Sequence, residues 1–125
     1  MNLSNLPNLH IFSLCTVIKC NALWPEVLHD ISTVLGTIPR SNEVTNLWFG
    51  FKMVGWTCFC GCLDQDWVGM FNKVIRIAEG KPLMLELEMV IFMGILAERH
   101  SRQDELFAPL TGRVIYHTYL IRSQL

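Results

Sequence analysis

Three cysteines at alternate positions, Cys58, Cys60 and Cys62, are the residues with the clearest potential for metal or redox chemistry. On a β-strand, alternate side chains share a face but lie about 6.6–6.8 Å apart. Thiolates bound to one zinc ion, with Zn–S bonds near 2.3 Å, lie only roughly 3.8 Å apart. A regular strand holds these thiols too far apart to share a metal. We therefore predict that they are small hydrophobic fillers, with no metal site and no cofactor.

Two clusters place a histidine near carboxylates. Glu26 and His29 have the Glu-x-x-His spacing of di-iron helix bundles, but that chemistry needs two such pairs. No other histidine in the sequence follows a carboxylate by three residues. His100 and Asp104 lie in a second polar cluster, where a histidine could act as a general base. We interpret both clusters as solvated helix faces; a metal-independent enzyme that uses His100 or His117 is an alternative.

Aromatic and polar side chains in two apolar segments suggest a ligand-binding surface. His117 and Tyr119 share a face if the last apolar segment is a strand, and such a pair can orient a ligand by hydrogen bonds. Trp48, Phe51 and Trp56 supply aromatic area in the middle of the chain. We predict that these five residues line the ligand-binding surface.

The composition favours association. The chain has 125 residues, of which 51% are hydrophobic and 17% are charged, and its mean hydropathy is +0.34. That length is typical of one domain, here residues 1–125, with a flexible arm at residues 1–8. A small domain cannot bury so large an apolar fraction, so part of it should face a partner. We therefore predict a homo-oligomer.

Other features of the sequence argue against membranes and nucleic acids. The apolar run at residues 89–97 is too short for a spanning helix, which needs about 20 residues. The net charge is −1 and the ten Lys and Arg residues are scattered, whereas nucleic-acid binding depends on clustered positive charge. Five cysteines, an odd number, and an N-terminus without a basic leader indicate a cytoplasmic protein with reduced thiols.

Hydrophobic periodicity predicts alternating strands and helices. Pro25 suits the first turn of a helix. Gly36 is expected to end that helix in the left-handed conformation, and Gly80 is expected to end the next helix. The expected strands cover residues 9–19, 44–53, 55–63, 83–93 and 111–121, and the expected helices cover residues 25–35, 65–79 and 95–107.

This order predicts an α+β fold. The first six elements follow the ferredoxin-like β-α-β-β-α-β order, in which residues 44–63 form a hairpin in an antiparallel sheet with helices on one face. A helix and a strand then form a C-terminal α-β extension. A mostly α protein is the alternative, because residues 83–93 are rich in the helix formers Leu, Met and Glu.

The function expected from these features is binding. The leading hypothesis is a self-associating module that binds a small, largely apolar molecule or a protein partner. A protein–protein interaction or inhibitor-type protein without a pocket is the first alternative, and the metal-independent enzyme is the second.

Overall fold

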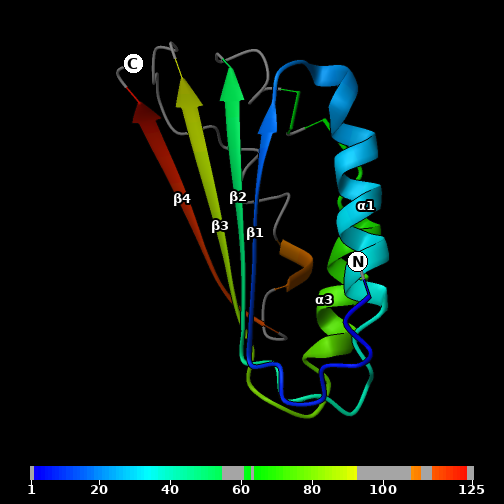
Figure 1. Ribbon diagram of the computed structural model, residues 1–125. Helices are drawn as coiled ribbons and strands as arrows, with labels where there is room; N and C mark the ends of the chain where they lie inside the picture. The colour runs from blue at the N-terminus through cyan, green and yellow to red at the C-terminus, as the bar shows by residue number, and fades with distance from the viewer. Residues whose placement is uncertain (1, 55–60, 63, 93–107, 111–113, 124–125) are drawn as a thin grey trace.

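A four-stranded parallel sheet with two helices forms the framework of the computed structural model, which describes residues 2–54, 61–62, 64–92, 108–110 and 114–123. The strands lie side by side in the order β1-β2-β3-β4, and each is parallel to its neighbour (Figure 1). They are β1 (Ile11–Ile18), β2 (Asn46–Val54), β3 (Met84–Phe92) and β4 (Ile115–Ser123). The helices are α1 (Trp24–Gly36) and α3 (Val68–Ile77), with short 3-10 turns η1 (Asn21–Leu23) and η2 (Ala108–Leu110).

The expected antiparallel, ferredoxin-like sheet is wrong. The prediction required a hairpin turn near residues 52–55, but β2 continues through that position to Val54. Residues 61–62 are helical rather than extended, and residues 55–60 lie outside the described part of the chain. After α3 the chain therefore enters β3 parallel to β2. The nearly continuous apolar run of β2 is typical of a parallel strand covered by helices.

The strand predicted over residues 83–93 is confirmed as β3, and the mostly α alternative is wrong. Leu85, Leu87 and Met89 point into the core, and Glu86 and Glu88 point the other way. Strict alternation therefore outweighs the helix propensity of Leu, Met and Glu in this segment. The helix predicted over residues 95–107 lies outside the described residues.

Both predicted helices that fall in the described part of the chain are present. Met70, Phe71 and Val74 form the buried side of α3 and are at most 2% exposed. Gly80, which follows this helix, has a φ of 77° and adopts the left-handed conformation. Gly36 instead forms the last residue of α1 and is not left-handed.

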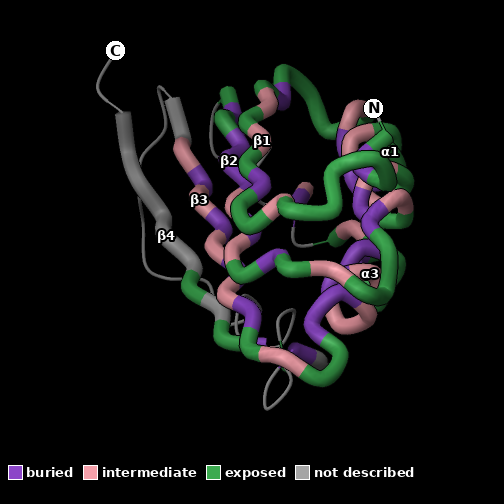
Figure 2. Tube along the Cα trace, turned by 60° about the horizontal axis from the view of Figure 1, so that its bottom comes forward, coloured by how far each residue is buried: buried purple, intermediate pink, exposed green. Residues whose placement is uncertain are grey.

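An aromatic cluster ties the helices to the sheet. Trp24 begins α1, and its ring centroid lies 5.3 Å from that of Phe51 on β2 and 5.9 Å from that of Trp67. Phe71 of α3 stacks on Trp67 at 5.8 Å. Buried residues accordingly line the space between sheet and helices (Figure 2).

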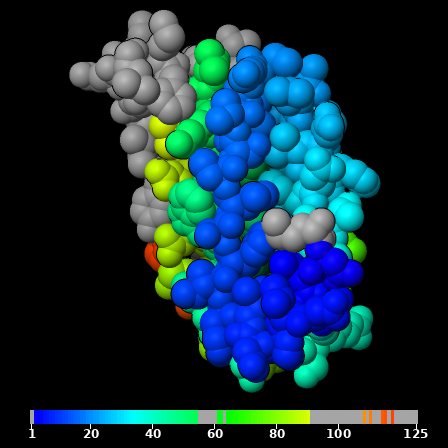
Figure 3. Space-filling view, viewed as in Figure 1, coloured from blue at the N-terminus to red at the C-terminus, as the bar shows by residue number. Residues whose placement is uncertain are grey.

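The N-terminal segment packs against the framework. The side chain of Leu3 is buried, and its backbone N–H donates a hydrogen bond to Thr37 Oγ1 at 2.9 Å. This segment, dark blue in Figure 3, lies at the lower end of the molecule. Residue 3 of the expected arm is thus anchored next to the end of α1.

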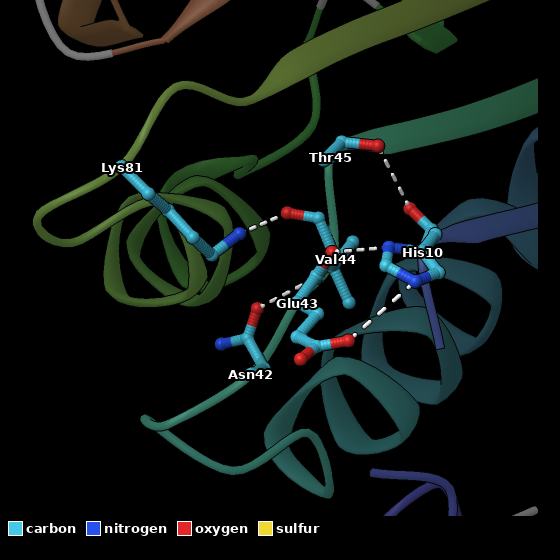
Figure 4. A network of polar contacts seen from close by, with 6 residues as sticks. All are labelled: His10, Asn42, Glu43, Val44, Thr45 and Lys81. Carbon is cyan, nitrogen blue, oxygen red and sulfur yellow. Dashed lines mark hydrogen bonds and ion pairs between the residues drawn. The ribbon is translucent and has the colours of Figure 1, made fainter. Parts of the chain in front are cut away.

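Polar contacts join the segments that lead into the strands (Figure 4). His10 Nδ1 lies 3.1 Å from the carbonyl oxygen of Glu43, and Thr45 Oγ1 donates to the carbonyl of His10 at 3.2 Å. Lys81 Nζ donates to the carbonyl of Val44. Partial burial lowers the pKa of Lys81. These contacts fix the starts of β1, β2 and β3 relative to one another.

Both helices lie on the same side of the sheet (Figure 1). Parallel crossover connections are almost always right-handed. Because β1, β2 and β3 are added in the same direction, the connections that carry α1 and α3 pass over the same face. No described helix covers the opposite face.

Candidate functional site

The face of the sheet turned away from α1 and α3 is the candidate interaction surface of the described residues, and we call it the outer face. It is formed by the odd-numbered residues of β1, the even-numbered residues of β2 and β3, and Ile115 and His117 of β4. The parallel register aligns these residues in rows. One row is Ser13, Trp48, Glu86 and His117, and the next begins with Cys15, Gly50 and Glu88.

Exposed aliphatic side chains concentrate on the outer face. Of the six large hydrophobic side chains that are exposed in the described part of the chain, four lie there: Ile11, Val17, Val54 and Ile115. Parallel sheets in proteins are almost always covered on both faces. An exposed apolar face on such a sheet is typical of an interaction surface.

Trp48 lies on β2, one of the two central strands of the outer face, and is half-buried. A Cβ atom placed on Gly50 would lie 2.5 Å from Trp48 Cη2 and 3.0 Å from Cζ2. The tip of the indole therefore covers Gly50, and the ring lies along β2. Gly50 leaves the space that this ring position needs, so the outer face presents a flat aromatic surface.

Charged side chains are set among these apolar ones. Glu86 and Glu88 lie on β3, and Lys52 lies on the neighbouring strand β2. Within the described residues, no salt bridge joins Lys52 to either glutamate. The outer face thus carries both positive and negative side chains. Lys52 and the two glutamates do not pair with one another within one chain.

The structure separates the predicted ligand-binding residues. Trp48 and His117 lie on the outer face, two strands apart in one row, with Glu86 between them. Phe51 is fully buried in the aromatic cluster on the opposite side of the sheet. Trp48 and Phe51 therefore cannot line the same pocket.

The other two predicted ligand-binding residues lie partly or wholly outside the described part of the chain. Tyr119 pairs in register with Glu88, and its side chain lies outside the description. Trp56 lies outside the described residues altogether, as does His100. Lys52, Glu86 and Glu88 were not among the predicted site residues, although the alternation in β3 places both glutamates on one face.

Of the three alternate cysteines, only Cys62 lies in the described part of the chain. It is fully buried, and burial raises the pKa of its thiol, so the thiol stays protonated. Its carbonyl accepts a hydrogen bond from Trp67 Nε1 at 2.9 Å. Among the described residues, no group of His, Cys, Asp and Glu is arranged to hold a metal ion.

A hollow of about 300 Å³ lies between the N-terminal halves of α1 and α3. Leu28 and Met70 form apolar parts of its lining, and His29, Ser32 and Asp66 are polar lining residues. Asp66 Oδ1 also accepts a hydrogen bond from the N–H of Val68 at 3.0 Å. The hollow is distinct from the outer face because the sheet and the core separate the two.

The described helices are all too short or too polar to cross a membrane. The fold and the outer face together define a parallel sheet protein wound in one direction, with helices on one face and exposed aliphatic and charged side chains on the other. Comparison of the chain with protein-family models, curated proteins and solved structures gives no match.

Proposed function

We propose that the protein is a self-associating module whose interface is the outer face of its sheet. The observation that carries this proposal is the concentration of exposed aliphatic side chains on the one face of a parallel sheet that no described helix covers. Burial of apolar surface is the main driving force of protein association, at roughly 25 cal/mol per Å². Trp48 supports the proposal because aromatic residues are enriched at the centres of interfaces.

The exposed thiols of Cys15 and Cys20 are compatible with a reducing compartment such as the cytoplasm. Cys15 lies on the outer face beside Gly50, so a face-to-face contact would also cover this thiol. We propose a cytoplasmic site of action on this basis.

The test compares two substitutions at equally exposed aliphatic positions. Ile115 on the outer face is 56% exposed, and Val68 at the start of α3 is 57% exposed. We expect Ile115→Glu to convert an oligomer into a monomer in sedimentation velocity, because a charge would be buried without a partner. Val68→Glu should leave the oligomer intact. A monomeric wild-type protein, or equal behaviour of the two variants, would contradict the proposal.

A second candidate function, small-molecule binding, is supported by the hollow between α1 and α3. Its volume of about 300 Å³ is at the lower end of the range of ligand sites. The carboxylate of Asp66 beside apolar Leu28 and Met70 suits a small molecule with an apolar body and an amine.

Substitution of Gly69, which also lines the hollow, tests this candidate. A Cβ atom at Gly69 would meet only Ser32 Oγ, at 3.8 Å, so Gly69→Ala leaves most of the hollow open. Gly69→Leu should fill it. Benzylamine binding, followed by NMR shifts of residues 28–32, should survive in Gly69→Ala and disappear in Gly69→Leu. Shifts that are identical in both variants would exclude this hollow as the binding site.

A further inference from the structure

The charged side chains of the outer face indicate how two copies of the chain would meet. This inference rests on the proposed function. We infer that the outer face binds the outer face of a second copy of this chain, with Lys52 of each copy paired with Glu88 of the other. A two-fold axis makes such a contact twice, because each residue pair in an isologous interface has a symmetric counterpart.

The two glutamates form no salt bridge with the described residues, although His117 neighbours Glu86 in the register. Glu86 and Glu88 are alternate residues of β3 on the same face, so their α-carbons lie about 6.6 Å apart. Like charges this close repel each other, and burial of the face would increase the cost. Within the described residues neither glutamate forms a salt bridge. An interface that covers them must therefore bring positive charge.

Lys52 is placed to provide that charge to a second copy. It lies on β2 next to β3 and pairs in register with Val90, two residues beyond Glu88. The outer face therefore carries opposite charges on its two central strands. A face with charges of one sign would require a partner with charges of the opposite sign. A face with opposite charges on adjacent strands is complementary to a second copy of itself when a two-fold axis passes between those strands.

The size of the outer face is sufficient for a small dimer interface. Four strands at the usual spacing and about nine residues long span roughly 19 Å by 30 Å, or on the order of 550 Å² in projection. Side chains increase the accessible area above this projection. Standard interfaces bury about 800 Å² per partner, and weaker ones bury less. A dimer formed by this face alone belongs at the lower end of that range.

Flanking residues add the apolar part of the contact. Val17 lies beside Lys52 in the register, and Trp48 with Gly50 forms the flat surface next to Glu88. In this arrangement the aliphatic and aromatic groups supply the affinity, and the charge pairs select the register of the two sheets.

A charge exchange tests the pairing. Lys52→Glu and Glu88→Lys should each raise the dimer dissociation constant about tenfold or more, because each places like charges in contact. The double variant K52E/E88K restores two opposite pairs, and its dissociation constant should return to within about threefold of the wild-type value. The control double variant Arg40→Glu with Glu26→Lys changes exposed charges off the outer face and should leave the constant unchanged. Sedimentation velocity gives the constants, and circular dichroism verifies folding.

Two results would overturn this inference while the proposed function stands. In the first, the double variant dissociates at least as much as the single variants. In the second, the charge variants remain dimers while Ile115→Glu dissociates. A wild-type protein that is monomeric at all concentrations would instead contradict the proposed function itself.

Discussion

The contact between Trp48 and Gly50 shows how a glycine, which has no Cβ atom, shapes the outer face. Because a Cβ atom at Gly50 would lie 2.5 Å from Trp48 Cη2, Gly50→Ala forces the indole to move. We expect Gly50→Ala to lower the free energy of unfolding by about 1 kcal/mol, the lower end of the cost of overpacking. Urea denaturation measures this change.

A double-mutant cycle separates this contact from a general effect of alanine. In a Trp48→Ala background the obstacle is absent, so Gly50→Ala should cost less than about 0.5 kcal/mol or stabilise the strand. The same cost in both backgrounds would mean that the indole does not lie over Gly50.

At the scale of elements, Arg76 of α3 stabilises the end of α1. Its Nη2 atom donates to the carbonyl oxygens of Ile38 at 2.8 Å, Leu35 at 3.3 Å and Gly36 at 3.4 Å. The last carbonyls of a helix have no partners within the helix, and a cation there also interacts favourably with the helix dipole. This side chain therefore connects the two helices at one end of their packed faces.

Arg76→Met should lower the free energy of unfolding by about 1–2 kcal/mol, because hydrogen bonds from a charged donor are worth more than neutral ones. Arg40→Met is the matched control: Arg40 is exposed, and its side chain makes no hydrogen bond with the described residues. Urea unfolding of the two variants compares them directly. Equal midpoints would contradict the capping role of Arg76.

The elements were more predictable than their arrangement. Periodicity located α1, α3, β1, β2 and β3 within a few residues, because each has one buried face and local alternation reveals it. The direction of β3 was not predictable in this way, since it depends on whether a turn or a helix follows β2. No Asn-Gly or Asp-Gly sequence marks a hairpin turn after β2, so the local sequence did not determine how the chain continues from this strand.

The candidate site was predictable only in part, because the two faces of a strand look alike when both are apolar. Trp48 and Phe51 differ by an odd number of positions and so lie on opposite faces of β2. The sequence shows that the two residues lie on opposite faces, but it does not show which face the helices cover. Only the spatial order of the strands identifies the outer face and places Lys52 and Glu88 on adjacent strands.

At the scale of the whole molecule, the direction of winding determines where the exposed apolar groups lie. Strands added in one direction put α1 and α3 on one face of the sheet, which buries the aromatic cluster of Trp24, Phe51 and Trp67. The same winding leaves Ile11, Val17, Val54 and Ile115 on the other face. The high apolar content of the chain is therefore divided between a core and an exposed surface.

This division predicts that stability depends on protein concentration. If a second copy covers the outer face, unfolding must also dissociate the dimer, and a hundredfold increase in concentration can add up to about 2.7 kcal/mol per dimer. The midpoint of thermal unfolding should therefore rise between about 1 µM and about 100 µM protein. Ile115→Glu should remove the dependence, because it prevents apolar contact, and Val68→Glu should retain it. A wild-type midpoint that is the same at both concentrations would mean that the outer face stays uncovered by a second copy, and that its aliphatic side chains remain in water.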